Sequence, residues 1–169
     1  MVGFSMAGDE AGYPAHDFAE VFAIAADAGL GCTIHAGEWA GPESVRAALE
    51  LPITRVAHGV RAIEEPALVS ELAARGIVLD TCPTSNVVLG VFPSYEEHPL
   101  PALRAAGVKV TLGSDDPPYF GATIEGEYDV CAERMGFGDD DLRDVTMTAI
   151  EAAFCDEALR EELRRRVRD

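Results

Sequence analysis

The sequence predicts an α/β fold built on parallel strands. Short apolar segments alternate along the chain with longer segments in which apolar residues recur every three or four positions, the pattern of strands joined by helices. The short segments show no polar alternation, which is typical of parallel strands covered on both faces. Polar residues capable of chemistry follow these segments, and parallel α/β folds assemble their active sites at that edge of the sheet.

The expected strands are short, and the helices lie between and after them. The strands cover residues 2–6, 32–35, 55–58, 77–81 and 108–112. The helices cover residues 17–28, 42–49, 66–75 and 100–106, with a helical tail from residue 140 that has a solvated, mixed-charge face over 157–168. Pro42 and Pro66 suit a first helical turn, and Gly29 and Gly76 suit a helix end. We find no repeat or linker, so we expect residues 1–169 to form a single domain.

Composition and charge restrict the class of partner. With 48% hydrophobic residues in a chain of 169, a packed core is expected rather than disorder. The net charge is −17, from 30 acidic and 13 basic residues, and such a surface repels phosphate backbones and anionic lipid headgroups. We therefore expect neither a nucleic-acid polymer nor a membrane as partner, but a small molecule that is neutral or cationic.

The cysteines and the N-terminal segment predict a cytoplasmic protein. Cys32, Cys82, Cys131 and Cys155 are widely spaced and form no CxxC pair, so we interpret them as reduced and mostly buried thiols. The first residues lack the basic start and long apolar stretch of a signal peptide, and no apolar run approaches the roughly 18 residues of a membrane span.

The segment His35-Ala36-Gly37-Glu38 stands at the end of the second expected strand. A neutral imidazole is a good zinc ligand, and a carboxyl group beside it can carry protons. Gly37 permits a tight backbone path that brings both groups toward one point. Taken alone, the segment fits equally well a capped loop that contains a histidine by chance.

Two further strand ends carry candidate groups. His58 ends the third expected strand; taken alone it reads more simply as a buried core histidine than as a group that holds a metal or a water. Asp115 and Asp116 follow the last expected strand, and adjacent carboxylates repel each other unless a cation or a polar substrate meets them. A turn or a helix cap is the alternative for this pair. Residues 82–86 form another polar loop at this edge, in which we expect Ser85 and Asn86 to bond to neighbouring loops.

The order of these strand ends carries more information than any one of them. Along the chain they read AGDE, HAGE, AHG, CPTSN and SDDP. This order resembles the adenosine and adenine deaminase family of metal-dependent amidohydrolases, over a stretch from Gly3 to about Leu163. The resemblance implies the C-terminal part of a TIM (β/α)8 barrel, with about five strands present and the N-terminal strands missing. It also implies a Zn²⁺ cofactor and the hydrolytic deamination of a purine, with release of ammonia.

The resemblance also assigns roles to residues. His35 and Asp115 resemble zinc ligands. Glu38 resembles the acid that protonates the purine ring nitrogen, and His58 resembles the group that orients and deprotonates the attacking water.

Two more residues resemble contacts to the small-molecule purine. Gly8 corresponds to a backbone contact with the base, and Asp116 to a contact with the five-membered ring. Adenosine is the favoured substrate; free adenine is the alternative, and a modified adenosine is a third option within the family.

The sequence departs from the family pattern at two places. Ser5 stands where family members typically have Asp, and the His-x-His pair that completes the family's zinc site is absent. His16 and His98 stand alone, and we expect both at the surface. Two zinc ligands are fewer than the usual three, so we interpret the chain as a fragment, a truncated product or a mis-called start, with little activity by itself.

Two readings from other classes remain open. The chain could be a non-catalytic remnant that binds a partner, or that associates with itself through exposed barrel edges. It could also be a different metal hydrolase on the same barrel, although the AGDE segment argues against this.

Overall fold

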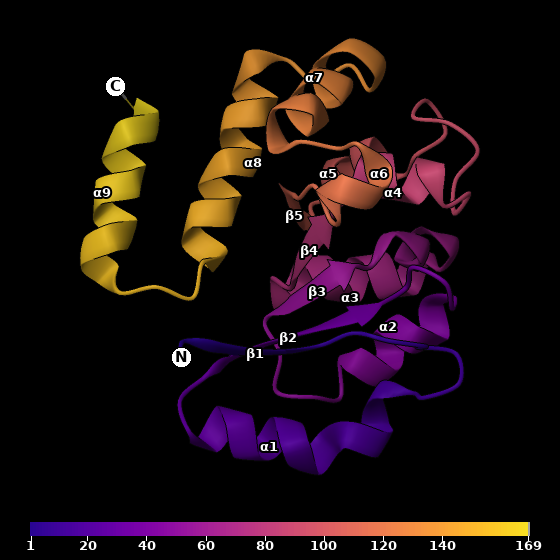
Figure 1. The fold of residues 1–169 in the computed structure, drawn as a ribbon, viewed down its shortest axis with the longest axis vertical. Helices are drawn as coiled ribbons and strands as arrows, with labels where there is room; N and C mark the ends of the chain where they lie inside the picture. Colours follow the sequence, from indigo (N-terminus) through magenta and orange to yellow (C-terminus); the bar gives the residue numbers. More distant parts are fainter. Residues whose placement is uncertain (169) are drawn as a thin grey trace.

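The structure is a computed structural model that describes residues 1–168. Within these residues the chain forms one sheet of five parallel strands in the order β1-β2-β3-β4-β5 (Figure 1). The strands are β1 Gly3–Met6, β2 Gly31–Ala36, β3 Arg55–His58, β4 Val78–Thr81 and β5 Lys109–Leu112. Each strand pairs with its neighbour in the sequence, all in parallel. The predicted α/β class and its strand order are confirmed.

Helices fill the connections and follow the last strand (Figure 1). The connecting helices are η1 Ala15–Phe18 and α1 Ala19–Asp27, α2 Pro42–Ala48, η2 Val60–Glu64 and α3 Pro66–Arg75, and α4 Pro83–Val88 and α5 Leu100–Ala105. The helices after β5 are α6 Pro117–Phe120, α7 Ile124–Arg134, α8 Asp139–Ala152 and α9 Glu157–Arg168. In the described part of the chain, every helix is too short or too polar to cross a membrane.

The helix signals in the sequence act as expected. Pro42 and Pro66 each stand in the first turn of a helix, where the missing N–H has no intrahelical partner to lose. Gly76 ends α3 with a φ of 65°, a left-handed conformation that glycine adopts without steric penalty. The observed bounds of these helices therefore lie close to the predicted ones.

Helices α4 and α7 were not predicted. Residues 82–86 were interpreted as a loop, but Pro83 starts a helix there. Helix α7 begins after Thr123, whose hydroxyl accepts a hydrogen bond from the Gly126 amide at 3.0 Å. The buried positions of α7 are Glu127 and Cys131, so a carboxylate interrupts the apolar pattern that would have marked the helix.

The core lies between the sheet and the helices that cover it. Ile34, Val56 and Leu79, from three consecutive strands, are buried, as are Leu68 and Leu72 of α3. Each such side chain contributes about 1.5–3 kcal/mol relative to an exposed one. The thiols are free, as predicted. Cys32, Cys82 and Cys131 are buried, and Cys155 is half-buried.

The segment after α8 covers the N-terminal ends of the strands. Phe154 lies against Gly3 and Gly31, where an added Cβ would come within 2.8 and 2.3 Å of its ring. The guanidinium carbon of Arg55 lies 5.3 Å from the centre of the same ring, and Arg55 also pairs with Asp80 at 2.9 Å. A cavity of about 890 Å³ lies at this end of the sheet, beside α8. The polar strand ends lie at the opposite end, and the candidate site is there.

Candidate active site

The parallel arrangement brings the polar strand ends to one edge of the sheet. His35 is the next-to-last residue of β2, and His58 is the last residue of β3. In the strand register Ala36 stands opposite His58, so the two imidazoles come from adjacent positions. Glu38 and Asp115 lie in the segments that directly follow β2 and β5.

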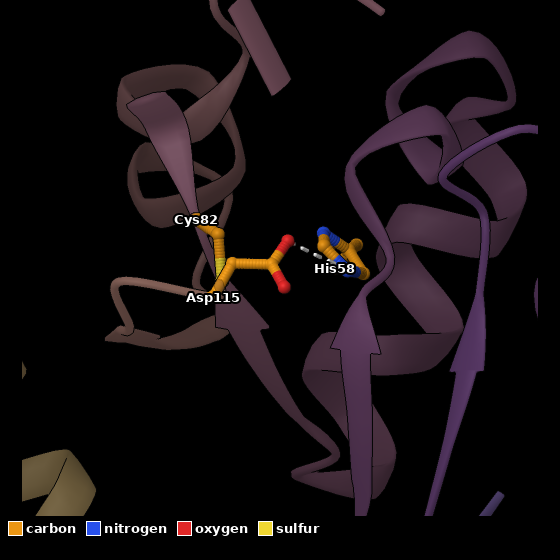
Figure 2. Close-up of side chains that lie close together, drawn as sticks. All are labelled: His58, Cys82 and Asp115. Carbon is orange, nitrogen blue, oxygen red and sulfur yellow. Dashed lines mark ion pairs between the residues drawn. The ribbon is translucent and has the colours of Figure 1, made fainter. Parts of the chain in front are cut away.

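The structure brings these four side chains together. His58 Nε2 lies 3.5 Å from Glu38 Oε2 and 3.8 Å from Asp115 Oδ2. The rings of His35 and His58 have their centres 5.3 Å apart. Figure 2 shows His58 and Asp115 pointing toward each other, with Cys82 beside Asp115. An acid, two imidazoles and a carboxylate therefore face a common space.

The backbone is strained at two of these residues. Among residues 1–168, the non-glycine residues with positive φ are His58, at 64°, and Asp115, at 53°. For a residue with a side chain, this conformation costs about 1–2 kcal/mol. Such strain persists where the surrounding structure fixes it, and it gathers at functional sites. Here it turns both side chains toward the common space.

Glu38 is an acid kept from ionising by its surroundings. The residue is only 8% exposed, and its Oε1 has no hydrogen-bond partner. Burial, together with the negative charges of Asp115 and Glu10, raises the pKa of Glu38 to about 7. Near neutral pH, Glu38 therefore holds its proton for a large part of the time, as a general acid must.

His58 is held neutral. Burial, together with the nearby imidazole of His35, lowers the pKa of His58 to about 4 against the opposing charge of Asp115. Asp115 is itself oriented by Ser85 of α4, whose hydroxyl donates to Asp115 Oδ2 at 2.6 Å. This is the inter-loop bond that the sequence predicted for Ser85.

The donor set fits a metal ion. His35 Nδ1 lies 3.1 Å from the Met6 carbonyl oxygen, which can only accept, so the proton of His35 sits on Nδ1 and Nε2 carries a free lone pair. Metal-ligating histidines characteristically donate their other N–H in this way. His58, Cys82 and Asp115 also offer atoms within 4.8 Å of one another. Burial raises the pKa of the Cys82 thiol above its usual range, so Cys82 remains a poor ligand.

Glu10 is a site residue that the sequence analysis missed. Its carboxylate accepts hydrogen bonds from the backbone amides of residues 37–40 and from the Ser44 hydroxyl. The loop that carries Glu38 is thus wrapped around one carboxylate from the neighbouring strand end. The signal was present, because Glu10 follows β1 as Asp115 follows β5, but only Gly8 of that segment was singled out.

The two predicted purine contacts are placed differently. Gly8 lines a cavity of about 250 Å³ together with Glu10, Tyr13 and His35. Asp116 is exposed and starts α6, where its carbonyl accepts from the amide of Tyr119. Gly8 therefore adjoins the four converging side chains, whereas no hydrogen bond or ion pair within residues 1–168 joins the side chain of Asp116 to them.

One predicted position is wrong. His16 is exposed as expected, but His98 is only 3% exposed. Its ring is satisfied on both sides, because Nδ1 accepts from the Leu100 amide at 3.2 Å and Nε2 lies 3.1 Å from Asn86 Oδ1. A histidine with both nitrogens paired can be buried without penalty, and its surrounding sequence gives no sign of these partners.

Comparison with known proteins agrees with this geometry. The family model described as adenosine deaminase matches residues 1–169. An adenine deaminase of Chelativorans sp. (strain BNC1) is 56% identical over 165 residues, covering 96% of this chain and 50% of that protein. An adenine deaminase of Agrobacterium fabrum is 51% identical over 170 residues, covering 100% of this chain and 52% of that protein.

Comparison with solved structures agrees with the match to the family model. The adenine deaminase of Arthrobacter aurescens superposes with a TM-score of 0.95 at 31% identity, over 99% of this chain and 52% of that one. An amidohydrolase of Burkhoderia ambifaria with bound Zn superposes with a TM-score of 0.91 at 26% identity, over 99% and 48%. The chain spans about half the length of the relatives it matches. With its full length matched by the family model, the chain belongs to the adenosine deaminase family.

Proposed function

We propose that the protein to which these residues belong hydrolyses the amino group of a purine base, releasing ammonia. The observation that carries the proposal is Glu38, a buried carboxyl group with a pKa of about 7 that lies 3.5 Å from His58. A purine ring nitrogen must gain a proton when water adds to the neighbouring carbon, and an acid poised near neutral pH is suited to supply it.

Free adenine is the substrate that we propose. The sequence alone favoured adenosine and kept adenine as the alternative. The relatives at 51–56% identity carry the name adenine deaminase, and this supports the alternative over the first choice. The net charge of −17 disfavours a phosphorylated substrate and is compatible with a neutral base.

The proposed roles follow the contacts. His35, through Nε2, and Asp115 would hold Zn²⁺, which supplies Lewis-acid activation of water at neutral pH. Glu38 holds the proton for the ring nitrogen, and His58 orients the water. Gly8 would meet the base in the adjoining cavity, and Asp116 would meet the five-membered ring once substrate is bound. The cytoplasmic location expected from the sequence belongs to this proposal as well.

A complementary N-terminal half is part of the proposal. His35 and Asp115 make two protein ligands, and catalytic zinc sites use about three. We therefore expect little turnover by this chain alone. Self-association through the outer edges of β1 and β5 remains the competing use of the chain, since unpaired strand edges favour pairing with another chain.

The test compares two preparations and two substrates. The chain is purified alone and after co-expression with the N-terminal half of the Chelativorans adenine deaminase, each with stoichiometric zinc. Ammonia release is measured with adenine and with adenosine. We expect turnover from the complemented preparation and a higher kcat/KM for adenine. A higher value for adenosine would reverse the substrate assignment, and activity with neither purine would contradict the proposed reaction.

A further inference from the structure

A line of hydrogen bonds runs from a backbone amide into the candidate site. The Leu100 N–H donates to His98 Nδ1 at 3.2 Å, His98 Nε2 lies 3.1 Å from Asn86 Oδ1, and Asn86 Nδ2 lies 3.3 Å from His58 Nδ1. The three side chains are buried, with exposures of 3% for His98, 0% for Asn86 and 2% for His58. None of the roles proposed above uses His98 or Asn86.

The Leu100 amide, at the outer end of this line, determines which group donates and which accepts in every bond of the line. A backbone N–H can only donate, so His98 Nδ1 must accept and the proton of the neutral ring sits on Nε2. That N–H donates to the carbonyl oxygen of Asn86, and the Asn86 amide nitrogen then donates to His58 Nδ1. His58 Nδ1 must therefore accept, which leaves the proton of His58 on Nε2. Both rings are neutral, because in each ring Nδ1 accepts a hydrogen bond and so carries no proton.

The inner end of the line agrees independently. His58 Nε2 faces Glu38 Oε2 at 3.5 Å and Asp115 Oδ2 at 3.8 Å. The carboxylate of Asp115 can only accept, so the ring nitrogen that faces it is best satisfied when it carries a proton. The contacts on both sides of the His58 ring therefore favour the same tautomer.

We propose that His98 and Asn86 are positioning residues that hold His58 as the Nε2–H tautomer, so that His58 enters the reaction as a hydrogen-bond donor. The family resemblance implied that His58 both orients and deprotonates the attacking water. As the Nε2–H tautomer, His58 can still orient the water but cannot deprotonate it, because no lone pair of the ring faces the site. It also removes His58 Nε2 from the set of metal ligands and leaves His35 and Asp115. The tautomer follows from the structure alone; its meaning for catalysis rests on the proposed function.

The tautomer is measured by ¹⁵N NMR of the imidazole rings. The full chain is labelled with ¹⁵N-histidine and studied without metal, near pH 7.5, alone and with its N-terminal complement. We expect His58 and His98 each to show an unprotonated Nδ1 and a protonated Nε2. His16→Gln serves as the matched control, because His16 is exposed and its removal should leave both patterns unchanged. A protonated Nδ1 on His58 would overturn the proposal.

Substitutions of Asn86 or His98 should change the tautomer of His58 although His58 itself is not substituted. In Asn86→Asp the new carboxylate accepts from both histidines, so His58 is expected to switch to the Nδ1–H form. His98→Gln places an amide nitrogen near the position of Nε2 and should keep the native tautomer, whereas His98→Asn is too short to reach Asn86 and should give a mixture. Retention of the Nε2–H form in both Asn86→Asp and His98→Asn would mean that the line does not set the tautomer.

Activity then separates positioning from general stability. In the complemented enzyme we expect His98→Asn to lower kcat about 10- to 100-fold with little change in KM, as for other residues that orient a catalytic group, and His98→Gln to restore most of the rate. Equal losses in the two variants, matched by equal losses in melting temperature, would assign His98 a structural role only. If no preparation deaminates any purine, the proposed function fails, and the ¹⁵N pattern still decides the tautomer.

Discussion

Replacing Glu10 by glutamine tests how the loop that carries Glu38 is held. Glu10 Oε1 accepts from the amides of Glu38 and Ala40 at 2.9 and 2.8 Å, and Oε2 accepts from the Gly37 amide at 2.6 Å. Glutamine keeps one accepting oxygen but turns the other into an NH₂ group, which cannot accept from the Gly37 amide. The change leaves the size of the side chain almost unaltered, so hydrogen bonding is what it perturbs.

The expected loss is that of the charge-assisted Gly37 bond, because the Ser44 hydroxyl, which also donates to Oε2, can turn and accept from the new NH₂ group. Such a bond is worth about 1.5–3 kcal/mol, so Glu10→Gln should destabilise the protein by about 2 kcal/mol. For a chain of this size, that corresponds to a fall in melting temperature of about 4–8 °C. Glu10→Ala removes every bond to residues 37–40 and should lower the melting temperature further. In the complemented enzyme, displacement of Glu38 by about 1 Å would reduce kcat by about 100-fold.

Thermal unfolding followed by circular dichroism measures the loss, with ammonia release as the second readout. The matched control is Glu50→Gln, which makes the same chemical change at an exposed position. If Glu10→Gln melts within about 1 °C of Glu50→Gln and retains full activity, the amide bonds do not hold the loop, and the reasoning from the carboxylate geometry is refuted.

Three further predictions concern the same edge of the sheet. Glu38→Gln should lower kcat about 10²- to 10⁴-fold while the bound zinc, measured by metal analysis, stays unchanged; in the wild type, kcat/KM should decline as pH rises through about 7, because the required acid form ionises there. An undiminished rate for Glu38→Gln would remove Glu38 from the proton path. The pKa of His98 is lowered to about 4 in the folded state, against about 6.5 in the unfolded state. The unfolded state therefore binds the proton first, and the free energy of unfolding falls by up to about 3 kcal/mol as the pH drops from about 6.5 to 4. Urea unfolding of His98→Gln across this range should be flatter than wild type, and parallel curves would contradict the assignment. Gly37→Ala should destabilise the protein by more than about 1 kcal/mol, because φ is 66° and the new Cβ would lie 2.4 Å from Val45 Cγ2; an unchanged melting temperature would count against this packing.

The sequence was sufficient for the sheet because the local signals agreed there. Apolar runs, Pro42 and Pro66 at helix starts and Gly76 at a helix end all mark the same alternation of strands and helices. The unpredicted helices carry no such agreement. Helix α4 begins with Pro, Thr, Ser and Asn, which otherwise favour loops, and α7 buries Glu127 where an apolar residue would be expected. Helix α7 does have a local start signal in the Thr123 cap, but no apolar pattern follows it to mark the helix.

The converging residues were predictable because parallel strands align their ends. His35 and His58 lie at the ends of their strands, and Glu38 and Asp115 lie in the segments that directly follow strands, so topology places them together. The supporting contacts were not predictable in this way. His98 reaches the site through the side chain of an asparagine, a bond between two side chains that no spacing rule describes.

The substrate also lay beyond the sequence analysis. Adenine and adenosine differ by a sugar, and the motifs at the strand ends concern the base and the metal. Identity to named relatives, not a residue in this chain, supports adenine over adenosine.

The strand order has a consequence for how the molecule is built. Each strand pairs with the one made just before it, so every step of sheet growth closes a loop of a few tens of residues. Short loops close at low entropic cost, and a chain of such contacts can form progressively during synthesis. Asp115, which follows the last strand, is the final arrival among the four converging side chains. A metal ion that needs Asp115 would therefore bind only after these five strands have paired.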